Sequence, residues 1–238
     1  MKKYLPYYLL ILFQKLIIII RVVFFSSPSF LCTFCNSEKK GYYVGLFPNF
    51  ELSCSKCHSL GRHRHVANYL NSINIRNKDI IHFSAEDQLK DFINKHSIKK
   101  YYCVNLKPKK DEKFCNIESI HFDKDSFDIV LCNHILEHVD YISALKQLKR
   151  ILKKDGILLL TFPIIYQWDK TYSNKKIVTK KMRELHFGQY DHLHLFGKDI
   201  EKIIKTIGFE IDKFISYGEN SVNYGIKHGE ILFIAKNI

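Results

Sequence analysis

Four of the seven cysteines stand in two tight pairs, Cys32-x-x-Cys35 and Cys54-x-x-Cys57, with eighteen residues between the pairs. Each Cys-x-x-Cys turn directs two thiolates at one point, and two such turns complete a tetrahedron around a zinc ion. Four protein ligands leave no open position for water, so the spacing predicts a structural zinc ribbon. Two redox-active pairs, or reduced cysteines without metal, are the alternatives. The odd total of cysteines indicates a reducing compartment, not a secreted disulfide framework.

A basic run, Arg62-His63-Arg64-His65, follows the second cysteine pair. Arg62 and Arg64 each offer forked donors that suit a carboxylate or a phosphate. One interpretation is therefore a substrate edge that binds anions. The alternative is the solvated start of a helix.

The elements that would position these residues alternate between helix and strand from residue 62 onward. Apolar runs predict strands at 79–83, 100–106, 126–133, 156–163 and 230–236. Because these runs are apolar at consecutive positions, we expect strands buried on both faces, as in a parallel sheet. Helical spacing of apolar residues predicts helices between them, for example at 141–152. The order of elements predicts a doubly wound α/β sheet with right-handed crossovers.

Residues 164–197 fit no strand–helix unit. This stretch contains Trp168 and three histidines, His186, His192 and His194. Long insertions in compact domains are usually functional or disordered, and the aromatic content here argues against disorder. We therefore expect a functional insertion.

The segment from residue 4 to 25 is almost wholly apolar, but Gln14, Lys15 and Arg21 interrupt it. On a helix, Lys3, Gln14 and Arg21 fall within roughly 20° of one another and form a narrow polar stripe. We expect a basic helix that lies in the membrane interface. A single membrane span and a buried helix are the alternatives.

The charge balance indicates the general kind of partner. The formal net charge is +13, from 37 basic and 24 acidic side chains. Such an excess predicts attraction to an anionic partner, which could be a membrane surface, a nucleic acid or a phosphorylated substrate.

The chain resembles class I S-adenosylmethionine-dependent methyltransferases of the type 11-like group, in the subgroup with an N-terminal zinc ribbon of four cysteines. The resemblance covers residues 30–238, and its segments occur in the family's order and spacing. These segments read "CSKCHSLGRHR", "IIHFSAE", "FDKDSFDIVLCNHILEHV", "GILLLTFPI" and "HFGQYDHLHLFG".

The resemblance implies a Rossmann-like, seven-stranded sheet with flanking helices. The expected division is a membrane-interface helix at 1–25, a zinc ribbon at 26–61 and a methyltransferase-like domain at 62–238. Residues 164–197 become an insertion on the substrate side of that domain.

The resemblance also implies that S-adenosylmethionine binds at the carboxyl ends of the strands, where open α/β sheets place their ligands. The implied cofactor-binding residues are His82, Phe83, Ser84, Ala85, Glu86, Asn105, Leu106, Asn116, Ile117, Asn133 and His134.

Two departures from the family pattern concern this site. The turn "HFSAEDQL" after the first strand contains no glycine, and asparagine stands at 105 and 116 where the family usually has a carboxylate. An asparagine oxygen still accepts hydrogen bonds, but charge-assisted bonds are roughly twice as strong. We therefore expect weakened cofactor affinity.

Histidines are the expected catalytic residues, because an imidazole can take a proton near neutral pH. Our hypothesis places His134, at a strand end, beside the methyl group, with His192 and Asp191 reaching it from the insertion as base and orienting carboxylate. The alternatives are that His134 packs against adenine and that His192 only orders its loop. We expect Glu137 and His138 to be structural.

The predicted function is methyl transfer to a small-molecule or glycan-type acceptor, by a cytoplasmic protein peripheral to the inner face of a membrane. One alternative is a degenerate methyltransferase fold that acts as a scaffold. Another is a zinc-ribbon module that binds nucleic acid, which the even spread of lysines disfavours.

Overall fold

The computed structural model describes residues 16–17, 19–20, 29–45 and 50–238. The expected interface helix at 4–25 therefore lies almost entirely outside the described residues. Among the residues that are described, no helix is both long enough and apolar enough to cross a membrane.

The chain divides into two compact units. One comprises residues 75–214 and 231–238, and the other comprises the chain up to residue 74 together with 215–230. We call the second of these the ribbon unit. This division differs from the expected boundary at residue 61, because the ribbon unit also includes the helix that follows the ribbon and the segment 215–230.

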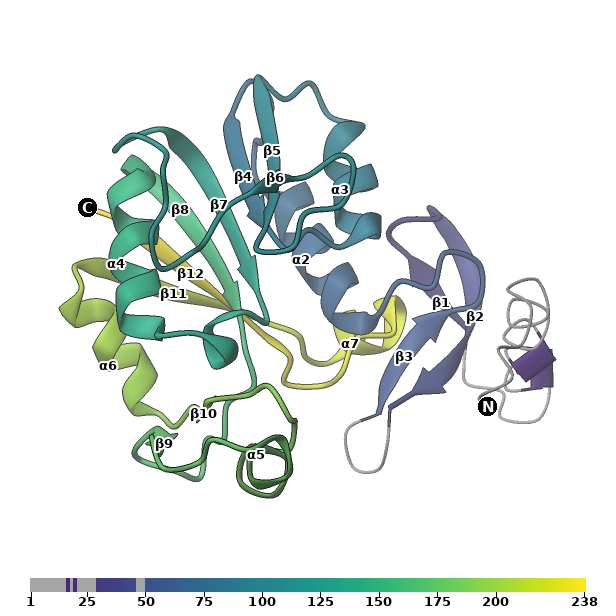
Figure 1. Ribbon diagram of the computed structural model, residues 1–238. Coiled ribbons are helices and arrows are strands. Elements are labelled where there is room, and N and C mark those ends of the chain that lie inside the picture. Colours follow the sequence, from purple (N-terminus) through teal and green to yellow (C-terminus); the bar gives the residue numbers. More distant parts are fainter. Residues whose placement is uncertain (1–15, 18, 21–28, 46–49) are drawn as a thin grey trace, which may run out of the picture. The chain divides into compact units, whose positions relative to one another are not determined.

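The larger unit is built on a seven-stranded sheet in the order β11-β12-β8-β7-β4-β5-β6 (Figure 1). Strands β4 to β8 run parallel where they pair, and β12 runs antiparallel to β8. The predicted Rossmann-like sheet is confirmed. The strands are β4 (Asp79–Phe83), β5 (Lys100–Asn105), β6 (Lys113–Phe114), β7 (Phe127–Asn133), β8 (Leu152–Thr161), β11 (Phe209–Ile215) and β12 (Ile231–Asn237).

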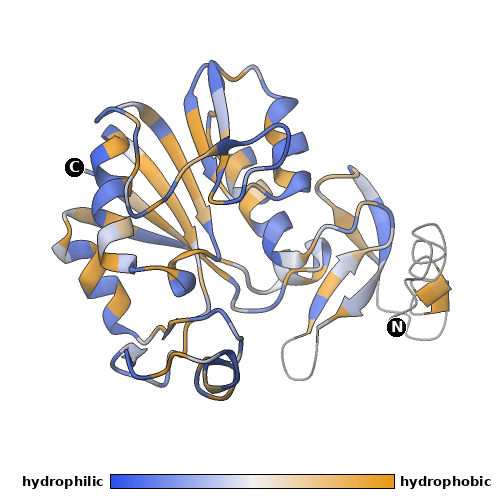
Figure 2. Cartoon of the chain, viewed as in Figure 1, coloured by the Kyte–Doolittle hydropathy of each residue, from blue (hydrophilic) through white to orange (hydrophobic). Residues whose placement is uncertain are grey.

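The core of this unit follows from the apolar strands (Figure 2). In β7, the four consecutive residues from Ile129 to Cys132 are all buried, which requires cover on both faces of the sheet. Helices α4 (Tyr141–Ile151) and α6 (Asp199–Thr206) contribute to the same core cluster as the central strands. Helix α3 (Asp87–Asn94) lies on the other side of the sheet in Figure 1.

Helix α4 shows how the sequence defines an element. Its N-cap, Asp140, accepts hydrogen bonds from the amides of Ile142 and Ser143. The buried face carries Leu145 and Leu148, at the spacing that puts side chains on one side of a helix. The cap therefore fixes where the helix begins, directly after the segment that carries the candidate site.

The insertion at 164–197 folds into a small structure of its own. Strands β9 (Tyr172–Ser173) and β10 (His194–Leu195) pair antiparallel, and helix α5 (Lys180–Phe187) lies between them in the sequence. A parallel bridge between Ile164 and Phe196 closes its base. It is tied to the residues that follow β7, because the amide of Leu193 donates to the carbonyl of Glu137 at 2.7 Å.

The ribbon unit contains an antiparallel sheet in the order β1-β2-β3. Its strands are β1 (Ser29–Cys32), β2 (Ser37–Val44) and β3 (Glu51–Cys54), and its helices are α2 (Gly61–Ser72) and α7 (Glu219–Tyr224).

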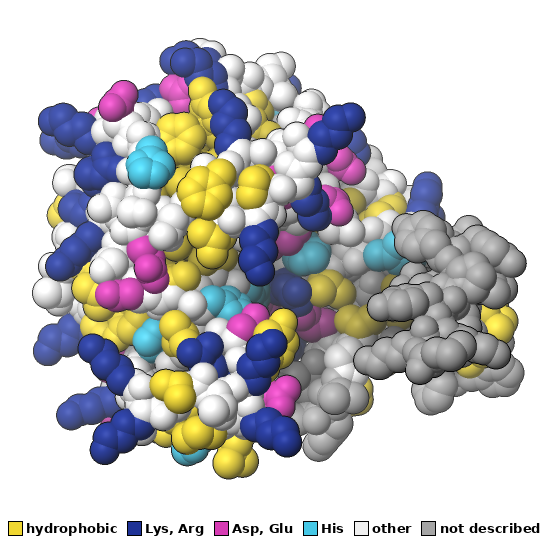
Figure 3. Space-filling model, viewed as in Figure 1, with side chains coloured by type: hydrophobic (Ala, Val, Ile, Leu, Met, Phe, Trp, Pro, Cys, Tyr) yellow, Lys and Arg dark blue, Asp and Glu magenta, His cyan; other side chains and the backbone are white. Residues whose placement is uncertain are grey.

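Basic side chains are spread over the face of the protein seen in Figure 3, with acidic ones between them. This view shows no single basic stripe of the kind that tracks a nucleic-acid backbone.

Candidate functional site

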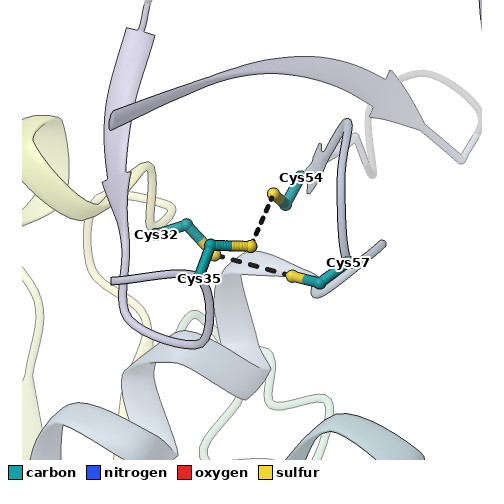
Figure 4. Close-up of side chains that lie close together, drawn as sticks. All are labelled: Cys32, Cys35, Cys54 and Cys57. Carbon is teal, nitrogen blue, oxygen red and sulfur yellow. Dashed lines mark hydrogen bonds between the residues drawn. The ribbon is translucent and has the colours of Figure 1, made fainter. Parts of the chain in front are cut away.

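The four paired cysteines meet in the ribbon unit, and their sulfur atoms point toward one another (Figure 4). The Sγ atoms of Cys32 and Cys57 are 3.6 Å apart, and those of Cys35 and Cys54 are 3.9 Å apart. Zn–S bonds of ~2.3 Å in a tetrahedron put sulfur atoms about 3.8 Å apart. The observed separations therefore fit a tetrahedral zinc site with four thiolate ligands.

The local electrostatics suit a bound cation. Hydrogen bonds from Cys54 and Cys57 lower the pKa of the Cys32 thiol, so this cluster favours a thiolate at Cys32. Burial raises the pKa of Cys35 to about 11. Metal binding requires deprotonated cysteines, and an ion would release the protons that the other thiols hold.

Arg64 does not form the expected anion-binding edge. Its side chain is fully buried, and its guanidinium lies 4.3 Å from the centre of the Phe30 ring. All five N–H donors are used within the unit, one of them on the Ser59 hydroxyl. The other four donate, at 2.5 to 2.9 Å, to the backbone carbonyls of Leu52, Ser59, Tyr224 and Gly225.

Burial lowers the pKa of Arg64 to about 10, and the neighbouring cysteine thiolates oppose that shift. Arg64 therefore joins α2 to β3 and α7, with no donor left for a ligand. Arg62 forms an ion pair with Glu51, so its charge is already matched within the unit.

In the larger unit, the candidate cofactor site lies at the carboxyl ends of β4, β5 and β7. The strand order reverses at β4, since β5 lies on one side and β7 on the other. Ligands of open α/β sheets bind at such a switch point. Two residues that directly follow strands have positive φ, namely Ser84 at 49° after β4 and His134 at 50° after β7.

These backbone turns are held by hydrogen bonds to neighbouring strands. The amide of Ser84 donates to the carbonyl of Val104, and the amide of His134 donates to the carbonyl of Thr161, both at 2.7 Å. Left-handed residues other than glycine are uncommon and concentrate at ligand sites. Ser84 thus adopts the turn for which the family uses glycine.

Five of the predicted cofactor residues lie in or next to the first turn. Ser84 is exposed and Glu86 half-buried, whereas Phe83 and Ala85 are buried. His82 is fully buried, and its ring nitrogens contact the Tyr101 hydroxyl at 2.9 Å and the Glu86 carboxylate at 2.8 Å. His82 therefore orients Glu86 and does not itself reach the site.

The asparagines occupy the next strand ends. The side-chain oxygen of Asn105 accepts from the amide of Lys107, and that of Asn116 accepts from the amide of Glu118, each at 3.0 Å. Asn133 is buried and accepts from the Thr161 hydroxyl. Leu106 is exposed beside Asn105, whereas Ile117 is buried beside Asn116.

His134 is the histidine at the strand end. Its Nδ1 lies 3.3 Å from Glu137 Oε1, and its buried Nε2 has no hydrogen-bond partner. The expected pairing of Asp191 with His192 is not found. Asp191 instead contacts His138, with its backbone oxygen at 3.2 Å and its carboxylate at 3.6 Å from His138 Nδ1.

His192 lies against His138, with ring centres 4.7 Å apart and planes at 81°. Burial, and then the neighbouring His138 imidazole, lower the pKa of His192, so the ring is neutral at neutral pH. Burial also lowers the pKa of His194, which bonds to the Val139 carbonyl at 2.9 Å.

The comparisons with known proteins agree on one fold. Residues 94–160 match the family model of a methyltransferase domain. A solved S-adenosylmethionine-dependent methyltransferase from Mesorhizobium loti superposes with a TM-score of 0.53 and 12% identity, covering 74% of this chain and 98% of that one. The 1,6-didemethyltoxoflavin-N1-methyltransferase from Burkholderia thailandensis, solved with bound 1,6-didemethyltoxoflavin and S-adenosylhomocysteine, superposes with a TM-score of 0.52 and 13% identity, covering 74% of this chain and 78% of that one.

The larger unit thus has the fold of S-adenosylmethionine-dependent methyltransferases, and residues 94–160 within it match a methyltransferase domain. An uncharacterized protein of Methanocaldococcus jannaschii is 46% identical over 52 residues, which make up 21% of this chain and 23% of the relative. The chain therefore spans less than a quarter of that curated relative.

The residues of the methyltransferase domain fit the cofactor. Ser84 and His134 let the backbone turn without glycine, and the Nε2 of His134 at the same edge is a buried polar atom with no hydrogen-bond partner. Each asparagine oxygen has a second lone pair, so Asn105 and Asn116 can still accept from ribose or adenine.

Two functional features were not predicted from the sequence, one in each unit. Arg64 looked like a surface cation, because a pattern of alternating charge does not reveal which side chain the fold will enclose. Glu137 was expected to be structural, and its unpartnered oxygen emerges only from the packing of the insertion. A glutamate within an otherwise apolar run, "NHILEHV", was the one available signal.

Proposed function

We propose that the protein transfers the methyl group of S-adenosylmethionine to a hydroxyl or amine of a small-molecule or glycan-type acceptor at the cytoplasmic surface of a membrane. The observation that carries this proposal is that two left-handed residues, Ser84 and His134, directly follow the paired parallel strands β4 and β7 at the same edge of the sheet.

In this proposal the strand ends hold the nucleoside. Asn105 and Asn116 accept hydrogen bonds from its hydroxyls and base, Leu106 offers an exposed apolar surface, and the Ser84 turn lets the backbone approach closely. Bound S-adenosylmethionine would supply a sulfonium methyl group, whose carbon would bond to the acceptor as the C–S bond broke and the sulfur left as a neutral thioether.

His134 is the proposed proton acceptor. Its Nε2 has no partner, and Glu137 Oε1 lies 3.3 Å from its Nδ1, where the carboxylate would hold the ring in place. The proton of the acceptor group passes to Nε2 as the new bond to carbon forms. Alignment of the two reacting atoms supplies most of the rate enhancement.

Two sequence features support the location. The apolar segment at 4–25 and the net charge of +13 both favour an anionic membrane surface. Flotation of the full chain with vesicles tests this part. We expect binding to vesicles with anionic lipid that weakens at high salt; equal binding to neutral vesicles, or none to either, contradicts it.

Titration calorimetry with S-adenosylhomocysteine tests the cofactor site. Wild-type protein should bind it, and His134→Asn should bind it within about threefold, because asparagine also tolerates a left-handed backbone. The same variant should lose methyl transfer from labelled S-adenosylmethionine to lipid and glycan extracts by roughly 10²–10⁴-fold.

His121→Asn is the matched control, since His121 is an exposed histidine that is not among the residues proposed to bind the cofactor or to take the proton. Folded protein that binds no S-adenosylhomocysteine would point instead to a non-catalytic scaffold. Full activity in His134→Asn would remove His134 from the proton-transfer role.

A further inference from the structure

Three side chains converge where the insertion meets the residues after β7. Glu137 and His138 lie in the short 3₁₀ helix η1 (Leu136–His138), and His192 comes from the insertion. One potential ligand atom from each lies within 4.8 Å of the other two. Glu137 and His138 are adjacent in the sequence, but His192 is brought to them only by the fold.

Two of these side chains bury polar atoms that have no hydrogen-bond partner. Glu137 is 1% exposed and its Oε2 is unpartnered, while His192 is 9% exposed and its Nδ1 is unpartnered. No lysine or arginine forms an ion pair with Glu137 in the part of the chain that the structure describes. A buried carboxylate normally requires a partner charge or a metal ion.

The contacts around the three side chains resemble the outer shell of a metal site. Histidines that bind metals usually donate their other ring N–H to a carbonyl or carboxylate, which fixes the ring. His138 Nδ1 contacts a carbonyl and a carboxylate of the same residue: the backbone oxygen of Asp191 lies at 3.2 Å and its side-chain carboxylate at 3.6 Å. Glu137 Oε1 is likewise engaged by His134 at 3.3 Å.

We propose that Glu137, His138 and His192 bind a divalent transition-metal ion, distinct from the zinc of the cysteine cluster. Two imidazoles and one carboxylate suit zinc, manganese or iron and leave positions open for another ligand. Bonds of ~2.0–2.2 Å to one ion place neighbouring ligand atoms roughly 3–3.5 Å apart, so the three side chains would close around the ion from within their present limit of 4.8 Å. The amide of Leu193, bonded to the Glu137 carbonyl, already holds the two segments in register.

The position of the ion gives it a part in the reaction, and this part rests on the proposed function. Glu137 would bridge the metal and the proposed base, because one of its oxygens faces His134 and the other is unpartnered. An acceptor hydroxyl in an open metal position would lie near His134 and would lose its proton more readily. The inference thereby narrows the acceptor to an oxygen nucleophile.

Manganese binding to the full chain tests the site directly, because Mn²⁺ prefers oxygen and nitrogen ligands and competes poorly for a site made of four thiolates. The zinc-loaded protein is titrated with Mn²⁺, and free Mn²⁺ is followed by electron paramagnetic resonance. We expect one bound ion per chain. Glu137→Gln and His192→Ala should each weaken binding at least tenfold.

Glu184→Gln and His186→Ala, both on α5 and outside the cluster, serve as matched controls and should bind Mn²⁺ as the wild type does. Absence of bound Mn²⁺ in folded wild-type protein, or unchanged affinity in Glu137→Gln, overturns the proposal. Parallel calorimetry with S-adenosylhomocysteine separates the two ideas. Cofactor binding without metal binding refutes the metal site alone, and the reverse refutes the proposed function alone.

Discussion

Asn105 shows how a single side chain sets the strength of the proposed site. Its oxygen accepts from the amide of Lys107 and remains half-exposed at the end of β5. In the proposed site it takes the place at which the family resemblance implies a carboxylate for the ribose hydroxyls. An amide oxygen can occupy the same place, but its hydrogen bonds are weaker than those of a charged acceptor.

Asn105→Asp should therefore bind S-adenosylhomocysteine more tightly. Hydrogen bonds to charged groups exceed neutral ones by about 1 kcal/mol, which corresponds to roughly fivefold in affinity. Asn105→Ala should bind more weakly than the wild type. Calorimetry on the three proteins ranks them, and an aspartate variant that is weaker than the alanine variant contradicts the placement of Asn105 at the ribose.

Among the basic residues of the ribbon unit, Arg64 is the one whose substitution we expect to lower the free energy of unfolding most. Arg64→Gln leaves several buried carbonyls without donors and should lower the free energy of unfolding by about 3–5 kcal/mol. Arg62→Gln removes only a partly exposed ion pair with Glu51 and should cost less than ~1 kcal/mol. Chemical denaturation compares them, and equal losses would contradict the buried role of Arg64.

At the scale of elements, ion pairs connect the amino ends of β4, β7 and β8. Lys153 of β8 bonds to Asp79 of β4 at 2.7 Å and to Asp128 of β7 at 2.8 Å. The hydrogen bond from Lys153 lowers the pKa of Asp79, and Lys99 adds to the effect. Burial raises the pKa of Asp128, but Lys153, the Asp79 amide and Lys78 outweigh it.

Because both carboxyl pKa values are lower in the folded state, this stabilisation is present above about pH 4 and is lost as the pH falls through the lowered values. Lys153→Met should cost about 1–2 kcal/mol at pH 7, since the lysine is one-third exposed, and progressively less below pH 4. Denaturation curves across pH measure this. A cost independent of pH would contradict the network, and Lys198→Met, at an exposed pair, is the control.

Elements were more predictable than side-chain roles. The apolar run at 79–83 coincides with β4, and the run at 126–133 differs from β7 by one residue, because burial on both faces leaves a clear apolar signature. The four cysteines were predictable because a metal imposes fixed spacing. The contacts of Arg64 and the pairing of Asp191 with His138 depend on segments distant in sequence, so no local pattern encodes them.

At the scale of the whole molecule, the two compact units should depend on metal differently. The ribbon unit has a small apolar cluster centred on Phe30, Cys32 and Cys54, whereas the larger unit has a large core. Small units with so little core generally need a metal to fold.

Removal of zinc with a strong chelator should therefore raise amide hydrogen exchange in β1, β2 and β3 while β4, β7 and β8 stay protected.

Cys54→Ser should lose one zinc per chain, and Cys103→Ala, at a cysteine outside the cluster, should retain it. Metal analysis with exchange mass spectrometry reads both quantities. A ribbon that keeps its protection without metal would contradict a structural zinc site.

The central claim is that the carboxyl ends of β4, β5 and β7 hold S-adenosylmethionine. Amide hydrogen exchange of the wild-type protein, with and without S-adenosylhomocysteine, tests this claim most directly. We expect slower exchange at 83–86, 105–107, 116–117 and 133–135 when the ligand is present. Unchanged exchange at those segments at saturating ligand, or protection confined to the ribbon unit, would contradict the account.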